Sequence, residues 1–227
     1  MNSPKTPRRR QLGWKGALSA VSLIVLLVTP NPSLPQRNRG KSWASYYPLA
    51  KGNSWTYSVI GESGEREPKP VVWKVLNVSS DTKGQTFAVW QIPADADDTG
   101  MQLQFTKEGL RELSGDFFLL RFPLDKDSTW QLIAHDRVFS VLSEGERCAI
   151  GKLTFNSCAV IRDDDREAKL RTLTTYAFGV GPVRYEYHKM VHGDFERDAT
   201  QILNIVSYSV KPSAGGALDR NHQKTNE

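Results

Sequence analysis

Hydrophobic and polar residues alternate along most of the chain with the two-residue period of β-strands. The alternating segments are short, rich in Val, Ile, Thr and aromatic residues, and separated by turns rich in Gly, Asp, Asn, Ser and Pro. They predict strands over residues 55–59, 71–78, 86–92, 101–105, 117–122, 137–142, 154–161, 170–176, 183–187 and 202–210. The pattern therefore predicts an all-β domain over residues 46–210. In it, an antiparallel meander of ten or more strands forms a curled sheet or barrel, with a two-sheet sandwich as the alternative.

The N-terminal segment has a different pattern. Five Lys or Arg residues precede an uncharged apolar run over residues 16–28. A basic segment followed by such a run is typical of an export signal, and the run is shorter than the roughly 20 residues that cross a bilayer as a straight helix. We therefore interpret residues 1–29 as an apolar helix that serves as an export signal or as a retained membrane anchor.

Two further segments lack a strand pattern. Residues 30–45 are rich in Pro, Asn, Arg and Ser, which is typical of a linker. Residues 211–227 have no apolar periodicity, which predicts a disordered tail.

The all-β domain contains an internal repeat. The segment YPLAKGNSW at residues 47–55 aligns with FPLDKDSTW at residues 122–130, and VWKVL at 72–76 aligns with VFSVL at 138–142. An acidic segment at 95–98 aligns with a second one at 163–165, and we interpret both as loops. This order of matches predicts a duplication with halves at about 47–121 and 122–210. Trp55 and Trp130 would then be equivalent buried anchors.

The charge is unevenly divided along the chain. Of the 30 Lys and Arg residues, eight lie within residues 1–41, which contain none of the 25 Asp and Glu residues. The rest of the chain therefore has 22 basic and 25 acidic residues, a net charge of −3, although the whole chain carries +5. A slightly acidic domain has no basic surface for phosphates, so we expect no nucleic-acid partner. The basic N-terminal segment would meet a membrane as a lasting partner only if it stays uncleaved.

The chain has two cysteines, Cys148 and Cys158, in one predicted hairpin. In an exported protein they would lie in an oxidising compartment. A turn near residues 152–154 would place their side chains opposite each other. We expect a disulfide with Cα atoms about 4.4–6.8 Å apart, with two free, half-buried thiols as the alternative. No other Cys or His pair lies near enough in sequence to suggest a metal site.

Several segments resemble a loose family of exported bacterial proteins of unknown function. These are YYPLAKGNSWTYSV at 46–59, FTKEGL at 105–110, AIGKLTFNSCAVI at 149–161 and TYAFGVGPVRYEY at 175–187. Members of that family open with a [YF]-[YF]-P-L-x-x-G-x-x-W-x-Y motif. The resemblance implies an exported all-β domain and supplies no catalytic residues. The chain differs from many such proteins in lacking a cysteine for a lipid anchor.

Candidate metal chemistry is confined to one acidic segment. Asp95, Asp97 and Thr99, followed by Gly100, match the first half of a calcium-binding loop. The closing bidentate Glu is replaced by Thr106, so calcium would bind weakly. We therefore expect no cofactor, with calcium at these three residues as the alternative. The histidines are interpreted as surface residues: His135, His188, His192 and His222.

No nucleophile motif is present, so no catalytic residue is predicted. The abundant strand-borne aromatics predict either a filled core or a cavity for an apolar ligand. We therefore expect an exported, periplasmic or extracellular domain that binds or scaffolds an envelope protein or an apolar small molecule. The alternative is an extracytoplasmic hydrolase whose acid pair is assembled by the fold from Asp97, Glu108, Asp163 and Glu186.

Overall fold

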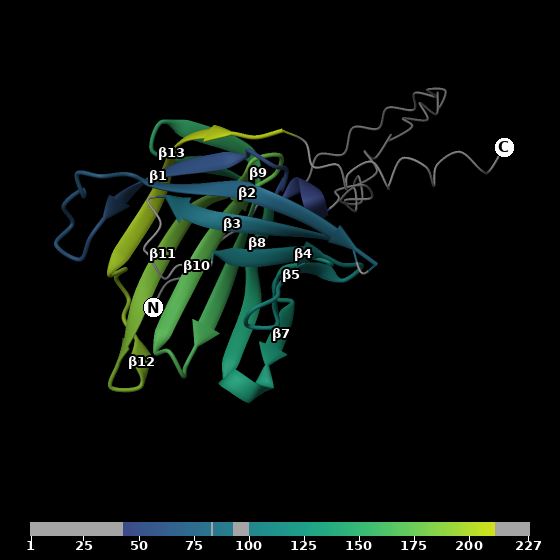
Figure 1. The fold of residues 1–227 in the computed structure, drawn as a ribbon. Coiled ribbons are helices and arrows are strands. Elements are labelled where there is room, and N and C mark those ends of the chain that lie inside the picture. Colours follow the sequence, from purple (N-terminus) through teal and green to yellow (C-terminus); the bar gives the residue numbers. More distant parts are fainter. Residues whose placement is uncertain (1–42, 83, 93–99, 212–227) are drawn as a thin grey trace, which may run out of the picture. The chain divides into compact units, whose positions relative to one another are not determined.

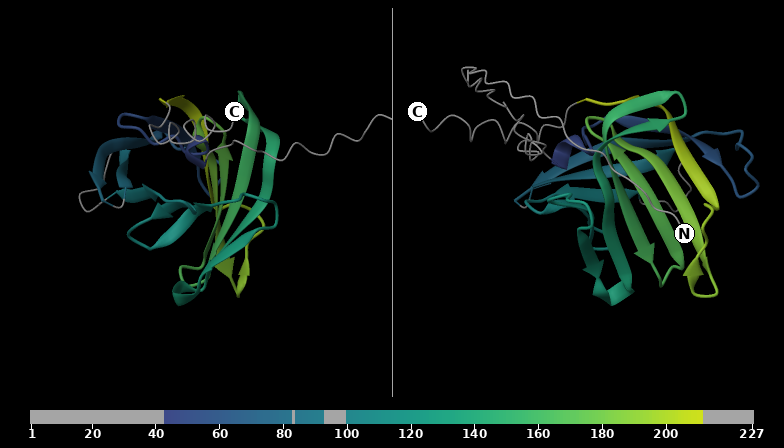
Figure 2. Two further views of the ribbon diagram at one scale, coloured as in Figure 1. Left: turned by 90° about the vertical axis from the view of Figure 1, so that its right-hand side faces the viewer. Right: turned by 180° about the vertical axis from the view of Figure 1, so that it is seen from behind.

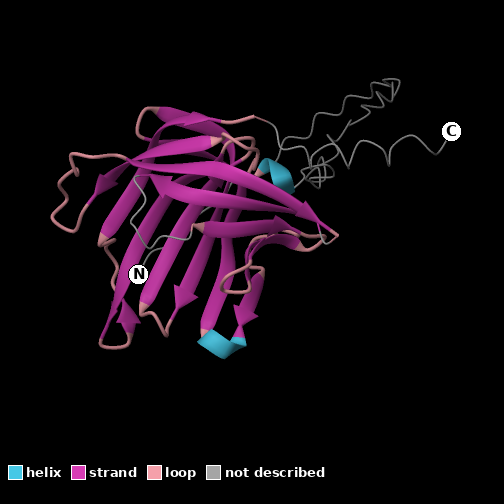
Figure 3. Ribbon diagram, viewed as in Figure 1, coloured by secondary structure: helices cyan, strands magenta, loops and turns pink. Residues whose placement is uncertain are grey.

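The computed structural model describes residues 43–82, 84–92 and 100–211. Almost all of this part is β-structure, with two short 3₁₀ helices, η1 (Trp43–Ser45) and η2 (Ile133–His135) (Figure 3). The strands are β1 (Ser54–Ile60), β2 (Val71–Asp81), β3 (Gly84–Ile92), β4 (Met101–Phe105), β5 (Gly109–Glu112), β6 (Phe117–Arg121), β7 (Thr129–Leu132), β8 (Arg137–Ile150), β9 (Leu153–Asp165), β10 (Leu170–Ala177), β11 (Gly181–Val191), β12 (Asp194–Phe195) and β13 (Gln201–Ser209).

The strands form one antiparallel sheet with the order β6-β5-β4-β3-β2-β1-β13-β11-β10-β9-β8-β7, and β12 pairs with β11 outside this path. Nearly every strand pairs with its neighbour in sequence, and the two meanders join where β1 pairs with β13. The predicted antiparallel all-β meander is confirmed. One continuous sheet is present rather than the two sheets of a sandwich. The predicted N-terminal helix lies outside the described residues.

The sheet curls so that strands of the first meander, β1 to β4, run across strands β8 to β11 of the second (Figures 1 and 2). The two edge strands of the sheet, β6 and β7, are joined by contacts that involve side chains. The indole Nε1–H of Trp130 on β7 donates to the carbonyl oxygen of Phe118 on β6 at 2.8 Å. The ring of Phe117 stacks on Phe139 of β8, with centroids 5.5 Å apart. The curl is therefore nearly closed, and the sheet has a concave and a convex face.

The two aligned segments begin with the same backbone hydrogen bonds. The N–H of Gly52 donates to Val75 O, and the N–H of Val75 donates to Asn53 O, each at 2.9 Å. In the second half, Asp127 and Ser128 make the same two bonds with Val141, also at 2.9 Å. Trp55 pairs with Trp73, and Trp130 pairs with Phe139, as the sequence alignment places them. Both anchors are buried, with 0% and 6% of their surfaces exposed.

The described structure begins within the segment expected to be a linker. Ala44 in η1 is 3% exposed, and the N–H of Gly179 donates to Ser45 O at 2.6 Å. At the other end, the backbone of Lys211 exchanges two hydrogen bonds with the side chain of Asn53. These contacts attach the N-terminal end of the described chain to the β10–β11 turn and its C-terminal end to Asn53, just before β1.

The predicted disulfide is present in the β8–β9 hairpin. Cys148 and Cys158 are bonded, with Cα atoms 6.1 Å apart. The turn lies at Gly151 and Lys152, earlier than expected, because Ile150 pairs with Leu153. Irregularities in the β8–β9 register then pair Cys148 with Phe155 and leave the cysteines diagonal rather than opposite.

Candidate binding site on the concave face

The concave face is sealed in one region and half-exposed in another. The sealed part, which we call the floor, is made of side chains with at most 6% of their surface exposed. It includes Tyr47, Leu49, Trp55, Tyr57, Val75, Val89, Leu103, Leu120, Trp130, Phe139, Val141, Ile161, Tyr176, Val183 and Leu203.

Beyond the floor, residues of the same face are only partly buried. This set, which we call the rim, comprises Val71, Trp73, Gln91, Met101, Phe117, Arg137, Asp163, Asp165, Leu170, Thr172, Tyr185 and Tyr187. Their face follows from the register, because residues directly opposite each other on paired strands project to the same side. Asp163 pairs with Phe139 of the floor, and Trp73 pairs with Trp55. The rim is therefore the part of the concave face that a ligand can reach.

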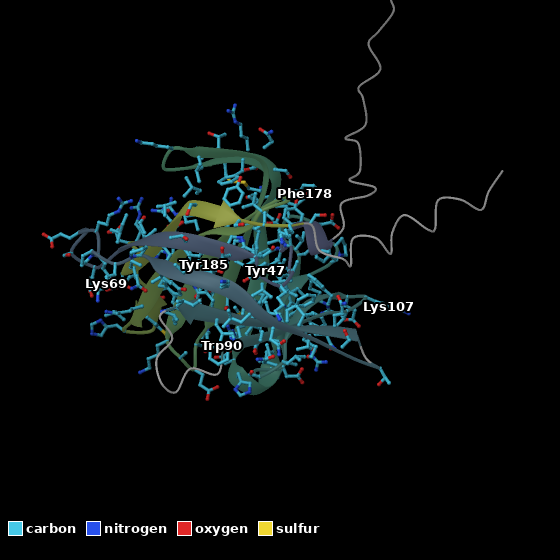
Figure 4. The ribbon with its side chains drawn as sticks, turned by 45° about the horizontal axis from the view of Figure 1, so that its top comes forward. Tyr47, Lys69, Trp90, Lys107, Phe178 and Tyr185 are labelled. Carbon is cyan, nitrogen blue, oxygen red and sulfur yellow. A yellow bond between two sulfur atoms is a disulfide. The ribbon has the colours of Figure 1, made fainter. Side chains whose placement is uncertain are left out.

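Five tyrosines line the junction between floor and rim: Tyr47, Tyr57, Tyr176, Tyr185 and Tyr187. The ring of Tyr57 lies 5.6 Å from that of Tyr185 and the ring of Tyr47 lies 6.1 Å from that of Tyr176, centre to centre, and Tyr57 Oη donates to Pro182 O at 2.8 Å. Figure 4 places Tyr47 and Tyr185 in the middle of the domain. Burial raises the pKa of Tyr187 to about 12 and raises the pKa values of Tyr57 and Tyr185 well above 10. These hydroxyls therefore remain protonated at neutral pH and can both donate and accept hydrogen bonds.

Trp73 contributes an unused donor. Its indole nitrogen is buried and has no hydrogen-bond partner in the described part of the chain. Trp55 and Trp130, by contrast, donate to the carbonyl oxygens of Val180 and Phe118. A buried polar group without a partner costs about 1–3 kcal/mol and calls for a specific explanation, such as water or a ligand. The Trp73 N–H is thus a candidate contact for a hydrogen-bond acceptor.

Arg137 is the central charged residue of the rim. Its Nε and Nη2 donate to the two carboxylate oxygens of Asp163 at 2.9 and 2.6 Å, a bidentate pair. Its guanidinium lies 4.0 Å from the ring centre of Phe117 and 5.1 Å from that of Phe139. Asp165 Oδ2 lies 3.7 Å from Nη1, beyond hydrogen-bond distance. Arg137 is therefore held in one orientation, and Nη1 is its least engaged nitrogen.

Burial disfavours the charged forms of both Arg137 and Asp163. It lowers the pKa of Arg137, but the hydrogen bond and charge of Asp163 outweigh it, and the net change is upward. Burial also raises the pKa of Asp163, with a further increase from the charges of Asp165 and Asp164, and Arg137 only partly offsets this. The ion pair is thus a costly group on a surface that apolar residues could have filled.

A pocket of about 390 Å³ adjoins this cluster. It is lined by Gly115, Leu132, His135, Arg137, Asp165, Glu167 and Ala168. One wall is the β5–β6 turn, where the buried carboxylate of Glu112 accepts hydrogen bonds from the N–H groups of Ser114 and Gly115. A Cβ at Gly115 would lie 2.6 Å from the Phe117 ring, so glycine lets this turn pack closely.

The opposite wall comes from η2 and the β9–β10 turn. Asp165 Oδ1 accepts the N–H of Ala168 at 2.8 Å, which fixes the turn. Across it, His135 Nδ1 lies 3.1 Å from Glu167 Oε2. The pocket therefore combines a small apolar surface with two carboxylates, one guanidinium and one imidazole, on a framework held by local hydrogen bonds.

The acids proposed for a hydrolase pair are not brought together. Asp163 is paired with Arg137, whereas Glu186 lies on the other face and contacts Arg184 at 2.9 Å. Glu108, in the β4–β5 turn, lies 3.5 Å from Arg121. Asp97 lies outside the described residues. Each described candidate is thus a carboxylate with its own arginine.

The second acidic segment is not a loop, contrary to the prediction. Asp163, Asp164 and Asp165 end strand β9 and pair with both β8 and β10. Arginines on the neighbouring strands make this possible. On the convex face, Asp164 accepts a bidentate bond from Arg171 at 2.5 and 2.9 Å. The first acidic segment, with the calcium candidates Asp95, Asp97 and Thr99, lies outside the described residues.

The histidines do not form a common site. His135 is exposed, His192 lies in the β11–β12 turn, and His222 is outside the described residues. His188 is buried, contrary to the prediction, with 6% of its surface exposed and its Nδ1 3.1 Å from Glu196 O. Within the described residues no group of three or more His, Cys, Asp or Glu side chains is placed to hold a metal ion. In the same residues, no helix has the length and apolar composition needed to cross a membrane.

Sequence reasoning missed Arg137, the pocket and the role of Trp73. Arg137 and Asp163 are 26 residues apart, and only the β8–β9 register brings them together. A usable signal was nevertheless present, since three consecutive acids are followed by basic residues at 166, 169 and 171. Alternating charges of this kind are compatible with cross-strand ion pairs as well as with a solvated loop.

No family model and no curated protein matches the chain. Among solved structures, a Bacteroides fragilis NCTC 9343 protein described as exported, with a YmcC-like fold, is similar with a TM-score of 0.40. It is 11% identical, and the match covers 70% of this chain and 96% of that one. A Parabacteroides distasonis ATCC 8503 protein described as a lipoprotein has a TM-score of 0.31 and 11% identity, with coverage of 72% and 98%. Both TM-scores are low, so the description of the fold rests on the strand pairing of this chain alone.

Proposed function

We propose that the chain is an exported binding domain whose small-molecule ligand lies against the rim of the concave face. The single observation that carries this proposal is the contrast between floor and rim. A sheet that only had to bury its aromatic side chains would cover them throughout. Here Trp73, Phe117, Tyr185 and Tyr187 stay partly exposed beside a floor whose side chains are buried.

The chemistry of the rim favours an amphiphilic ligand. Its aromatic rings and Met101 offer apolar contact, whereas the Trp73 N–H, the tyrosine hydroxyls and Arg137 offer hydrogen bonds. Ligand sites in proteins commonly combine an apolar lining with a few well-placed polar groups. The ligand is therefore expected to have an apolar body and at least one hydrogen-bond acceptor.

Export is supported by two independent features. The N-terminal sequence has the basic and apolar segments of an export signal. The cysteine pair forms a disulfide, a bond that persists in oxidising compartments and is rare in the cytosol. We therefore also propose that the domain lies in the periplasm or outside the cell.

Native mass spectrometry of the full chain, purified from the cells that produce it, tests the binding function. We expect a small molecule bound at one copy per chain. Trp73→Phe removes the unused N–H but keeps an aromatic ring, and should lower the bound fraction. Trp90→Phe is the matched control, because Trp90 pairs with Lys74 and so lies on the convex face of the neighbouring strand. A chain without any bound small molecule, or equal loss in both variants, would overturn the proposal.

A further inference from the structure

We infer that the 390 Å³ pocket between η2 and the two turns binds the cationic amine of an amphiphilic ligand. The inference rests on the proposed function and extends it, because Arg137 and Asp165 belong both to the pocket and to the rim. It names the chemical class of the ligand: an ammonium group attached to an apolar or aromatic body.

The pocket and the ion pair beside it have a net negative charge. Arg137 is the only guanidinium in its lining, and Asp163 already engages it through a bidentate pair. Two carboxylates of the lining remain, Asp165 and Glu167, and His135 is the only other group that can carry positive charge. With His135 neutral, the lining and Asp163 together have a net charge of −2, and with His135 protonated −1. Either state attracts a cation.

The contacts that Asp165 and Glu167 already make leave some of their oxygen atoms able to accept further hydrogen bonds. Asp165 Oδ1 accepts a backbone N–H, whereas among the residues that the structure describes Oδ2 has only the 3.7 Å approach of Arg137 Nη1. Glu167 contacts His135 through Oε2. Each carboxylate thus keeps acceptor capacity, and an ammonium group has three donors and no acceptor.

The size and walls of the pocket restrict the ligand further. A volume of about 390 Å³ lies within the range of small-molecule sites, and it is far more than one metal ion needs. Leu132 and Ala168 supply apolar contact for a carbon chain or ring. The ammonium group would therefore sit between Asp165 and Glu167, with the body of the ligand directed toward the rim.

The test compares three probes that share one body and differ in charge: 2-phenylethylammonium, 2-phenylethanol and 3-phenylpropionate. Binding to the full chain is measured by isothermal titration calorimetry at low salt. We expect the ammonium probe to bind at least about tenfold more tightly than the alcohol, a difference of about 1.4 kcal/mol. The carboxylate probe should bind most weakly. The advantage of the ammonium probe should decline as salt rises, because exposed charges are screened.

Two variants locate the site. The double variant Asp165→Asn and Glu167→Gln removes both charges, but each amide oxygen can still accept the bonds made now. It should remove the preference for the ammonium probe. Glu108→Gln is the matched control, since it removes an exposed carboxylate from the β4–β5 turn, and it should leave the preference unchanged. Equal binding of alcohol and ammonium, binding of neither, or an unchanged preference in the double variant would overturn the inference.

These outcomes are distinguishable from failure of the proposed function. If a natural ligand binds and depends on Trp73 but carries no amine, the rim is a binding site and the inference about the pocket is wrong. If the three probes bind according to charge while Trp73→Phe has no effect on any ligand, the pocket is a cation site and the proposed role of the rim is wrong.

Discussion

Reduction of the Cys148–Cys158 disulfide should destabilise the domain without unfolding it. The bond closes a loop of ten residues in sequence. The loop-closure entropy of the unfolded chain gives a stabilisation of about 2.7 kcal/mol at 25 °C for a loop of that size. The hairpin also covers part of the core, since Ile150 and Phe155, which flank the turn, are 5% and 8% exposed. Weakening the hairpin therefore exposes apolar surface that is now buried.

Urea unfolding of the full chain, followed by tryptophan fluorescence, measures this effect. With a denaturant slope of about 2 kcal/mol per molar, the midpoint should fall by about 1.3 M when dithiothreitol is added. The double variant Cys148→Ser and Cys158→Ala should have a low midpoint that no longer responds to dithiothreitol. An unchanged midpoint on complete reduction, verified by thiol labelling, would show that this bond does not stabilise the hairpin.

Three further predictions follow from buried groups. Asn53→Ala should lower the free energy of unfolding by about 2–4 kcal/mol in urea, because it removes three side-chain hydrogen bonds of a 1% exposed amide. Gly181→Ala should cost more than about 2 kcal/mol in the same assay, because Gly181 has φ of +110° and a Cβ there would lie 2.9 Å from Trp55 Nε1; an unchanged midpoint would contradict this close approach. Burial raises the pKa values of Tyr46 and Tyr187 to about 12, so the stability they support is complete below about pH 10 and is lost as pH rises through 12. Ultraviolet titration should show six of the seven tyrosines ionising above the ordinary range, because burial raises the pKa of each of them.

The sequence predicted the class of fold because alternation of apolar and polar residues is a direct consequence of one buried sheet face. It failed where strands are too short to show a period, as in β5 (GLRE) and β7 (TWQL), with four residues each. It also failed where β8 extends to Ile150, because residues 145–147 are exposed on both faces and have no alternation. Strand ends of this kind are determined by their partners rather than by their own residues.

The candidate site was less predictable for a related reason. Asp163 resembled a loop residue because three consecutive acids are normally solvated, and its partner Arg137 lies on another strand. The partial exposure of Trp73 could not be predicted from its own segment either, because Trp55, which lies directly opposite it on the paired strand and on the same face, is fully buried. Trp73 and Trp55 differ in burial because the curled sheet covers the floor of the concave face but leaves the rim partly open. The proposed duplication stays a prediction, supported by the shared hydrogen bonds at Gly52 and Asp127.

The most direct test of the rim as a ligand site is the indole N–H region of a two-dimensional ¹H–¹⁵N NMR spectrum of the full chain. Spectra are recorded with and without the small molecule that co-purifies with the protein, and Trp73→Phe and Trp90→Phe assign the two resonances. Ligand should shift the Trp73 indole resonance and slow its exchange with water, because the buried N–H gains an acceptor, whereas the Trp90 resonance should be unchanged. A Trp73 resonance that stays in place at saturating ligand would show that the ligand does not bind at the rim.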